Sequence, residues 1–281
     1  MSGNISGPFM KGWITMKLAC STWMMPGDTF SEKIKKAASY GFEGVEIRLF
    51  DNEAKPERIQ EILEALKEHG VEPCSLIMPG ETYRKPLLDR ETLKAKEELA
   101  VKALDAAALL GAPTLVCPEY GAQSPLPLFD HPIRPTPKQR ELLLEYLSFV
   151  ADYAVEVGAK ATIEPINRYE TRFYYTLEDG AKIIDEVGKP GLYLLADFFH
   201  MNIEEVSIPD AIRKYGDKIL HVHLGDSNRF LPGQGHTDFR SGFQALKEIG
   251  YDHFMAFECG IKGDPDIAFP RCVKFLRDAE R

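Results

Sequence analysis

Short apolar segments alternate along the chain with longer segments in which apolar residues recur every three or four positions. The short segments have few polar interruptions, a pattern typical of parallel strands that are buried on both faces. The longer segments have the period of amphipathic helices. The alternation predicts eight strands, at 17–21, 44–49, 72–77, 113–118, 160–166, 192–197, 219–224 and 253–259.

A helical segment follows each predicted strand. All but the last of these segments end at a glycine, the residue that helices prefer just after their carboxyl end. Thr29 with Glu32, and Thr176 with Asp179, have the spacing of a capping box at a helix start. The predicted helices are 29–41, 55–70, 90–111, 137–158, 177–188, 209–216, 241–250 and 265–280.

The repeated strand and helix units predict the fold class. Eight α/β units without a change of composition favour one (β/α)₈ TIM barrel over residues 17–281, after an extension at residues 1–16. A doubly wound open sheet is the alternative, because periodicity does not reveal strand order. The connections at 78–90 and 119–136 are longer than a barrel requires, and their proline and aromatic residues favour an ordered cover at its mouth.

Composition and charge narrow the classes of partner. The chain is 44% hydrophobic and 27% charged, as in ordinary globular proteins, and its formal net charge of −9 opposes binding to nucleic acid. It has no apolar run long enough to cross a bilayer, and its first residues lack the apolar centre of a secretion signal. We therefore expect a cytoplasmic protein that binds neither nucleic acid nor membrane. Five widely spaced cysteines are predicted to be reduced and buried.

Four side chains that can bind a metal ion stand at or near the predicted carboxyl ends of the last four strands: Glu164, Asp197, His223 and Glu258. Singly, each has a structural explanation, since buried acids usually pair with arginine or lysine and a strand histidine often belongs to the core. Together, uncompensated carboxylates at the ends of apolar strands would be costly without a cation. The oxygen-rich set predicts one divalent metal ion, with Mn²⁺ first and Mg²⁺ or Co²⁺ as alternatives.

Three further polar residues, Glu170, His200 and Arg229, follow these ligands at short spacing. Each lies just beyond a strand end, where a molecule bound at the ion could touch all three. Taken alone, Arg229 would be a solvated loop charge and Glu170 a carboxylate at a helix start. Trp23, just after the first strand, is either an apolar wall for a ligand or a core residue.

The strings EPINRYET, DFFHMNIEE and HVHLGDSNRFLPGQGH resemble the D-tagatose and D-allulose 3-epimerase group of the xylose-isomerase-like TIM-barrel superfamily, most specifically over residues 160–260. The resemblance implies four metal ligands, Glu164, Asp197, His223 and Glu258, and three sugar contacts, Glu170, His200 and Arg229. It also implies a small sugar substrate, and assembly into a homodimer or homotetramer. Phe198 departs from the threonine that the group tends to carry, which places a bulky ring beside a ligand and leaves the preferred ketose open.

The implied activity is that of a metal-dependent isomerase or epimerase acting on a small ketose, most specifically a ketose 3-epimerase. Inverting C3 requires a proton to leave from one face of the sugar and another to arrive on the opposite face, through a cis-enediolate. Two opposed carboxylates can do both if one starts ionised and the other protonated. Glu164 and Glu258 are the candidates for these catalytic roles.

Alternative chemistries on the same barrel also begin with proton abstraction beside a carbonyl. They include hydroxypyruvate isomerase, inosose dehydratase and dehydroshikimate dehydratase, which fold alone does not separate. A hydrolase resembling endonuclease IV is disfavoured, because it would need several metal ions, more histidine ligands and a basic surface, and this acidic chain has seven histidines. A non-catalytic sugar-binding protein is the third alternative, and the complete ligand set argues against it.

Overall fold

A computed structural model describes residues 15–121, 128–129 and 133–281 of the chain. Its strands form one closed barrel in which each strand pairs in parallel with the next and β8 pairs with β1. Closure confirms the predicted TIM barrel and excludes the doubly wound sheet. The strands are β1 Lys17–Ser21, β2 Gly44–Arg48, β3 Glu72–Ile77, β4 Thr114–Leu115, β5 Ala161–Ile163, β6 Leu192–Asp197, β7 Ile219–Leu224 and β8 Phe254–Phe257.

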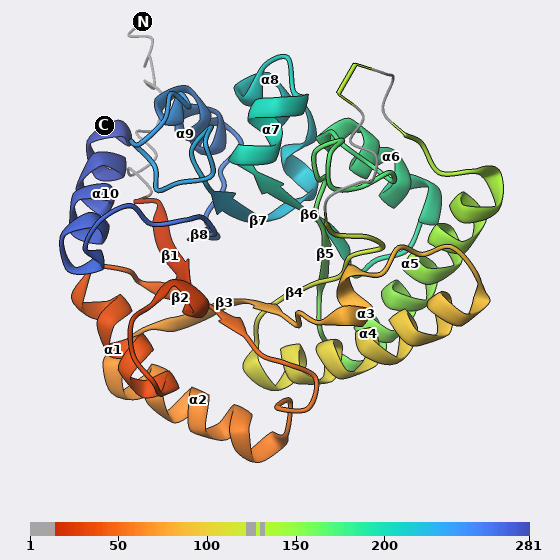
Figure 1. Cartoon of the computed structure of the whole chain (residues 1–281), viewed down its shortest axis with the longest axis horizontal. Helices are drawn as coiled ribbons and strands as arrows, with labels where there is room; N and C mark the ends of the chain where they lie inside the picture. The colour runs from red at the N-terminus through yellow and green to blue at the C-terminus, as the bar shows by residue number, and fades with distance from the viewer. Residues whose placement is uncertain (1–14, 122–127, 130–132) are drawn as a thin grey trace, which may run out of the picture.

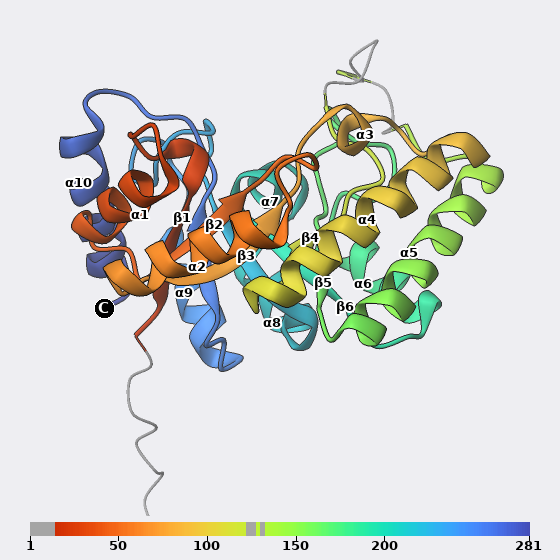
Figure 2. The same ribbon diagram turned by 90° about the horizontal axis from the view of Figure 1, so that it is seen from below.

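Helices surround the strands in a ring (Figure 1). The last helix lies beside the first (Figure 2), where the rings of Tyr40 and Phe269 stack with centroids 5.2 Å apart. The α-helices are α1 Phe30–Ser39, α2 Pro56–His69, α3 Glu81–Arg84, α4 Arg90–Leu110, α5 Pro137–Val157, α6 Leu177–Val187, α7 Phe198–Glu204, α8 Ile208–Tyr215, α9 Phe239–Glu248 and α10 Pro265–Ala279, and the 3₁₀ helices are η1 Thr22–Met24 and η2 Gly216–Lys218.

Each predicted strand is present, but β4 and β5 are shorter than predicted. The predicted segments included Pro118 and Pro165, and proline has no N–H to donate to a sheet. Two helices were not predicted: α3 lies in the connection 78–90, and α7 follows β6 without a loop. The predicted cover at 119–136 lies partly outside the described residues. Residues 1–14 of the predicted extension lie wholly outside them.

The predicted helix ends agree with the structure in most places. Left-handed glycines follow α2, α4, α5 and α6, and Thr29 and Glu32 form a capping box. Thr176 accepts the Asp179 N–H, but Asp179 binds the N–H of Tyr175 instead of returning the bond. Gly216 is right-handed, contrary to the prediction, because η2 begins there.

The core fills the space between the barrel and its helices. All five cysteines are buried and unpaired, as predicted. Met16 is also buried, and its N–H donates to the Glu280 carboxylate at 2.8 Å, so the described chain joins the barrel one residue before the predicted boundary. In the described part of the chain, no helix combines the length and apolarity needed to cross a membrane.

Phe198 does not occupy the barrel mouth. Its ring is fully buried against α9, stacked on Phe239 with centroids 5.6 Å apart and edge-on to Phe243. A Cβ atom added at Gly242 would stand 2.4 Å from the Phe198 ring, so a glycine on α9 makes room for it. The bulky side chain expected beside a metal ligand therefore points into the helix layer.

Candidate active site

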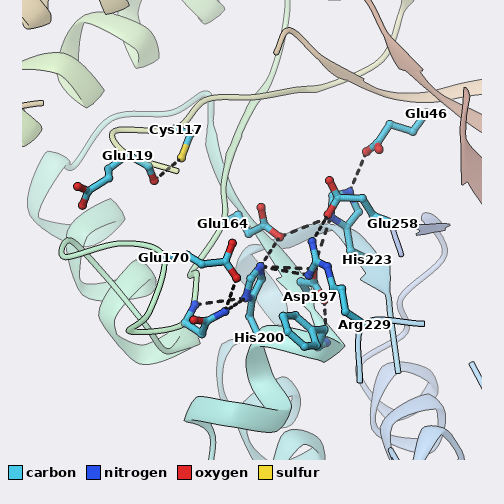
Figure 3. A network of polar contacts seen from close by, with 12 residues as sticks. Glu46, Cys117, Glu119, Glu164, Glu170, Asp197, His200, His223, Arg229 and Glu258 are labelled. Carbon is cyan, nitrogen blue, oxygen red and sulfur yellow. Dashed lines mark hydrogen bonds and ion pairs between the residues drawn. The ribbon is translucent and has the colours of Figure 1, made fainter. Parts of the chain in front are cut away.

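The four predicted metal ligands meet at one point in the barrel mouth (Figure 3). Asp197 ends β6 and His223 lies in β7, while Glu164 and Glu258 directly follow β5 and β8. Each offers one ligand atom, and these atoms all lie within 4.8 Å of one another. The strands bring the four side chains together, because the carboxyl ends of parallel barrel strands lie at the same rim of the barrel.

The donor atoms fit a divalent cation. Nδ1 of His223 lies 3.5 Å from Glu164 Oε1, 3.5 Å from Glu258 Oε2 and 3.9 Å from Asp197 Oδ2. Glu164 Oε1 and His223 Nδ1 are buried and have no hydrogen-bond partner in the described protein. Buried polar atoms normally have partners, and three carboxylate oxygens with one imidazole nitrogen suit a hard cation such as Mn²⁺, Mg²⁺ or Co²⁺.

Burial and the like charges of the three carboxylates make this cluster unfavourable unless positive charge is close by. Burial raises the pKa of Glu164 to about 8, since the lowering effect of His223 is opposed by the carboxylates of Asp197 and Glu258. Burial also raises the pKa of Asp197, despite the nearby Arg229 guanidinium and His223. Three acids in one desolvated space are stable as anions only when cations surround them.

Arg229 supplies part of that positive charge. Its guanidinium donates to Asp197 Oδ2 at 2.8 Å and to Glu258 Oε2 at 2.6 Å. The predicted sugar contact is therefore also an ion-pair partner of two predicted metal ligands, and it is not a freely solvated loop charge. Its guanidinium lies over the ring of Phe199, with the central carbon 4.6 Å from the ring centroid.

Asp226 organises the loop that carries Arg229. The Asp226 carboxylate accepts the N–H groups of Ser227, Gly233, Gly235 and Thr237. Arg229 has a φ of 59°, the one left-handed residue other than glycine in the described chain. Such backbone strain persists where the surrounding structure fixes it. A Cβ added at Gly235 would lie 2.4 Å from Asp226 Oδ1, so glycine is required for the carboxylate to reach these amides.

His200 and Glu170 are joined through Asn167, a residue that the sequence analysis did not single out. The Asn167 side chain donates to Glu170 Oε1 at 2.9 Å and lies 2.8 Å from His200 Nδ1, which also accepts the Asn167 backbone N–H at 3.3 Å. These two donors at Nδ1 favour the ring proton on Nε2, which lies 3.7 Å from Asp197 Oδ2; Arg229 Nη1, also a donor, lies 3.3 Å from the same nitrogen. Burial, together with Arg229 and His223, lowers the pKa of His200 well below its usual value, so the ring is neutral.

Glu46 is the second residue that sequence analysis missed. It lies in β2, is fully buried, and its Oε2 is 2.8 Å from Nε2 of His223 and 3.4 Å from Nε2 of His221. A separation of 2.8 Å is that of a hydrogen bond, so we interpret this group as a polar cluster behind the candidate ligand His223. The only signal in the sequence was one acid within the apolar run GVEIRL.

A cavity of about 260 Å³ opens beside the ligands. Glu258 and Arg229 form its inner wall, and Trp23, Tyr83 and Tyr120 line its sides. Trp23 is 44% exposed, which fits a wall of the cavity better than the core position. Two of the seven predicted site residues, Glu258 and Arg229, thus border a space into which a small molecule can enter.

Residues 34–279 match the xylose isomerase-like TIM barrel family. The chain belongs to this family. It is 31% identical over 244 residues to the L-ribulose 3-epimerase of Methylomonas sp. (strain DH-1), covering 85% of this chain and 82% of that protein. It is 27% identical over 265 residues to the 3-dehydro-D-guloside 4-epimerase of Escherichia coli (strain K12), covering 93% of this chain and 99% of that protein.

Solved structures in the family have the same architecture. The crystal structure of a 3-keto-D-glucoside 4-epimerase from E. coli superposes with a TM-score of 0.81 at 27% identity, covering 94% of this chain and all of that one. The resemblance to ketose 3-epimerases that the sequence motifs indicated is therefore confirmed. The prediction of an enzyme of the sugar isomerase and epimerase type is also confirmed, because the relatives that align with most of this chain are sugar epimerases.

Proposed function

We propose that this protein is a divalent-metal-dependent epimerase that inverts C3 of a small ketose, with Glu164 and Glu258 as acid and base. One observation carries the proposal: the two carboxylates come from strands on either side of the site, β5 and β8, and each has an oxygen in a cluster no wider than 4.8 Å. The L-ribulose 3-epimerase and D-psicose 3-epimerase relatives support the choice of C3.

Glu164, Asp197, His223 and Glu258 would hold the cation, for which Mn²⁺ is the first choice. When bound, a divalent ion polarises the sugar carbonyl as a Lewis acid and stabilises negative charge on the neighbouring oxygens. We retain a cytoplasmic location and a homodimer or homotetramer as parts of the proposal.

The side chains divide the proton transfers between them. One glutamate removes the C3 proton as a base, and the other, protonated, returns a proton to the opposite face of the planar enediolate. The neutral His200 would donate its Nε2–H to a sugar oxygen, and Asn167 holds the ring in this orientation. Arg229 would donate to a second sugar oxygen and stabilise charge that develops there. Glu170 fixes Asn167 and through it the ring.

A second candidate is epimerisation beside the ketone of a 3-keto glycoside. It is favoured by the E. coli 4-epimerase, which aligns with this chain over 99% of its own length. The same pair of carboxylates would serve, because the carbon to be inverted is again next to a carbonyl. The two functions differ in which carbon exchanges its proton with solvent.

The test is proton exchange in D₂O with Mn²⁺ present. D-fructose, D-allulose, D-tagatose, L-ribulose and a 3-keto glucoside are incubated with the enzyme, and NMR locates the deuterium. We expect deuterium at C3 of a ketose, and a rate lowered at least roughly a hundredfold in Glu164→Gln and in Glu258→Gln. Glu68→Gln, an exposed acid on α2, is the matched control.

Both variants must also be examined for folding and metal content, because the two acids are predicted ligands as well. Loss of exchange in a folded, metal-loaded variant supports the acid and base roles. Retained exchange in both variants would remove these glutamates from the mechanism, and deuterium at C4 of the keto glycoside alone would favour the second candidate.

A further inference from the structure

Two arginines line the cavity beside Glu258 without forming an ion pair. Most arginines in the described part of the chain are paired, for example Arg90 with Glu145 and Arg140 with Glu186. Arg48 and Arg84 border the cavity, yet neither has a carboxylate partner within 4.0 Å among the described residues. In a chain of net charge −9, two such cations at one opening are unexpected for a site that binds neutral molecules.

The structure holds Arg48 at the cavity wall. It ends β2, and its backbone N–H donates to Thr22 Oγ1 at 3.0 Å. Its guanidinium carbon lies 5.7 Å from the centroid of the Trp23 ring, an arrangement that orients the cation while leaving its N–H groups available. Asp28 and Glu53 border a second hollow on the other side of Arg48, but neither forms an ion pair with it.

Arg84 is exposed, but its backbone is fixed. It is the last residue of α3, and the buried ammonium of Lys96 binds the carbonyls of Thr82 at 3.0 Å and Tyr83 at 3.2 Å. The Arg84 carbonyl accepts the N–H of Tyr120 at 3.4 Å. Anchored in this way, α3 keeps an exposed cationic side chain in the lining of the cavity.

The charge of the inner wall differs from that of the rim. Arg229 is neutralised there by Asp197 and Glu258, which it contacts directly. Arg48 and Arg84 form no such ion pair among the described residues, so they add two positive charges to the lining of the cavity. Guanidinium groups bind phosphate and carboxylate through paired N–H donors, more strongly than they bind neutral hydroxyls.

We propose that Arg48 and Arg84 bind an anionic group on the substrate, so that the preferred substrate is a ketose with a phosphate or carboxylate at the end farthest from the metal ligands. This inference rests on the proposed function, which defines the end of the sugar that reacts. It names a substrate class that the relatives' names do not contain, since those proteins are described by neutral ketoses and glycosides.

The test compares D-fructose, D-fructose 6-phosphate and D-fructuronate on the Mn²⁺-loaded full chain, by calorimetry for binding and by deuterium exchange for turnover. We expect at least one anionic sugar to bind roughly ten- to a hundredfold more tightly than D-fructose. That preference should shrink as salt screens the charges, and it should fall about tenfold in Arg48→Gln/Arg84→Gln. The anionic sugar that binds more tightly shows whether the two arginines prefer phosphate or carboxylate.

Arg240→Gln is the matched control, since it removes a positive charge from exposed α9, away from the cavity. Equal affinity for charged and neutral sugars in the wild type would overturn the inference, as would a preference that the double variant keeps. C3 exchange without an anion preference contradicts this inference alone. An anion preference in binding without exchange on any sugar contradicts the proposed function and leaves the anion site supported.

Discussion

Glu46 shows how much one buried side chain can determine at this site. His223 faces the acid cluster with Nδ1 and faces Glu46 with Nε2, at 2.8 Å (Figure 3). A carboxylate on the far nitrogen fixes the ring's orientation, keeps the proton on that side and makes the near nitrogen a better ligand. The carboxylate also lies 3.4 Å from Nε2 of His221, so one acid from β2 is close to two histidines of β7.

We expect Glu46→Gln to weaken Mn²⁺ binding by roughly ten- to a hundredfold, because the amide polarises the imidazole less than a carboxylate does. Calorimetric titration with Mn²⁺ measures the affinity, and ¹⁵N chemical shifts of His223 report its tautomer. Glu68→Gln serves again as the control, and circular dichroism checks folding. Unchanged metal affinity together with an unchanged His223 spectrum would show that Glu46 is only a core residue.

The convergence of the four candidate ligands could be predicted because each stands at or just after a strand end, and strand ends were visible as the limits of apolar runs. Glu46, Asn167 and Asp226 could not be predicted in the same way. Their roles depend on contacts between units that are distant in sequence, as with Glu46 and His223, or on a loop shape that periodicity does not describe. The bulky Phe198 was misjudged for the same reason, since its direction is set by Gly242 on another helix.

At the scale of elements, the loop between β7 and α9 is the most specialised connection. It combines a strained Arg229 backbone with a carboxylate, Asp226, that accepts N–H groups from residues on both sides of the turn. Burial raises the pKa of Asp226, but the bonds from Thr237, Ser227 and Gly235 outweigh it, so the pKa is lowered overall. The ionised carboxylate is therefore the form that stabilises the loop.

Asp226→Asn should lower the free energy of unfolding by about 1.5–3 kcal/mol at pH 7, because an amide cannot accept all of these N–H groups. Since the folded pKa lies below the unfolded one, the carboxylate's contribution is complete above about pH 4 and disappears as the pH falls further. Urea unfolding at pH 7 and at pH 3 checks both points, with the exposed Asp217→Asn as control. A difference that stays constant over this pH range would contradict the assignment.

The existence of the strands and helices was predictable at this scale, and several of their limits were not. Glycines mark helix ends reliably where the backbone becomes left-handed, but Gly216 instead starts a 3₁₀ turn. Helix α7 was hidden because Asp197 both ends a strand and caps the helix, by accepting the Phe199 N–H. When a strand continues into a helix without an intervening turn, the sequence has no turn residues that mark the boundary.

On the scale of the whole molecule, the barrel was predictable from repetition, since each strand and helix unit is a local pattern and eight units suffice to close a cylinder. Strand order and closure themselves required the structure. The closed barrel brings together four candidate ligands from four successive units, and the three buried carboxylates among them repel one another unless positive charge is close by.

Removing the metal should therefore destabilise the entire barrel. A ligand at about a hundred times its dissociation constant stabilises a protein by about 2.7 kcal/mol, which corresponds to a Tm shift of roughly 5 °C at this size. We expect EDTA to lower Tm by that amount and added Mn²⁺ to restore it, as measured by calorimetry. Asp197→Asn should respond much less to Mn²⁺. A wild-type Tm that is indifferent to both treatments would argue against a resident cation.

Pairing between β1 and β8 has a consequence for synthesis in the cell. During translation, β1 leaves the ribosome before the other strands of the barrel and has an exposed edge until β8 arrives, because these two neighbours are far apart in the sequence. Glu258 directly follows that same strand, so a product that ends before β8 cannot hold all four candidate ligands. Premature stop codons and stalled ribosomes should yield chains that are open at one side, prone to aggregate and unable to retain the ion.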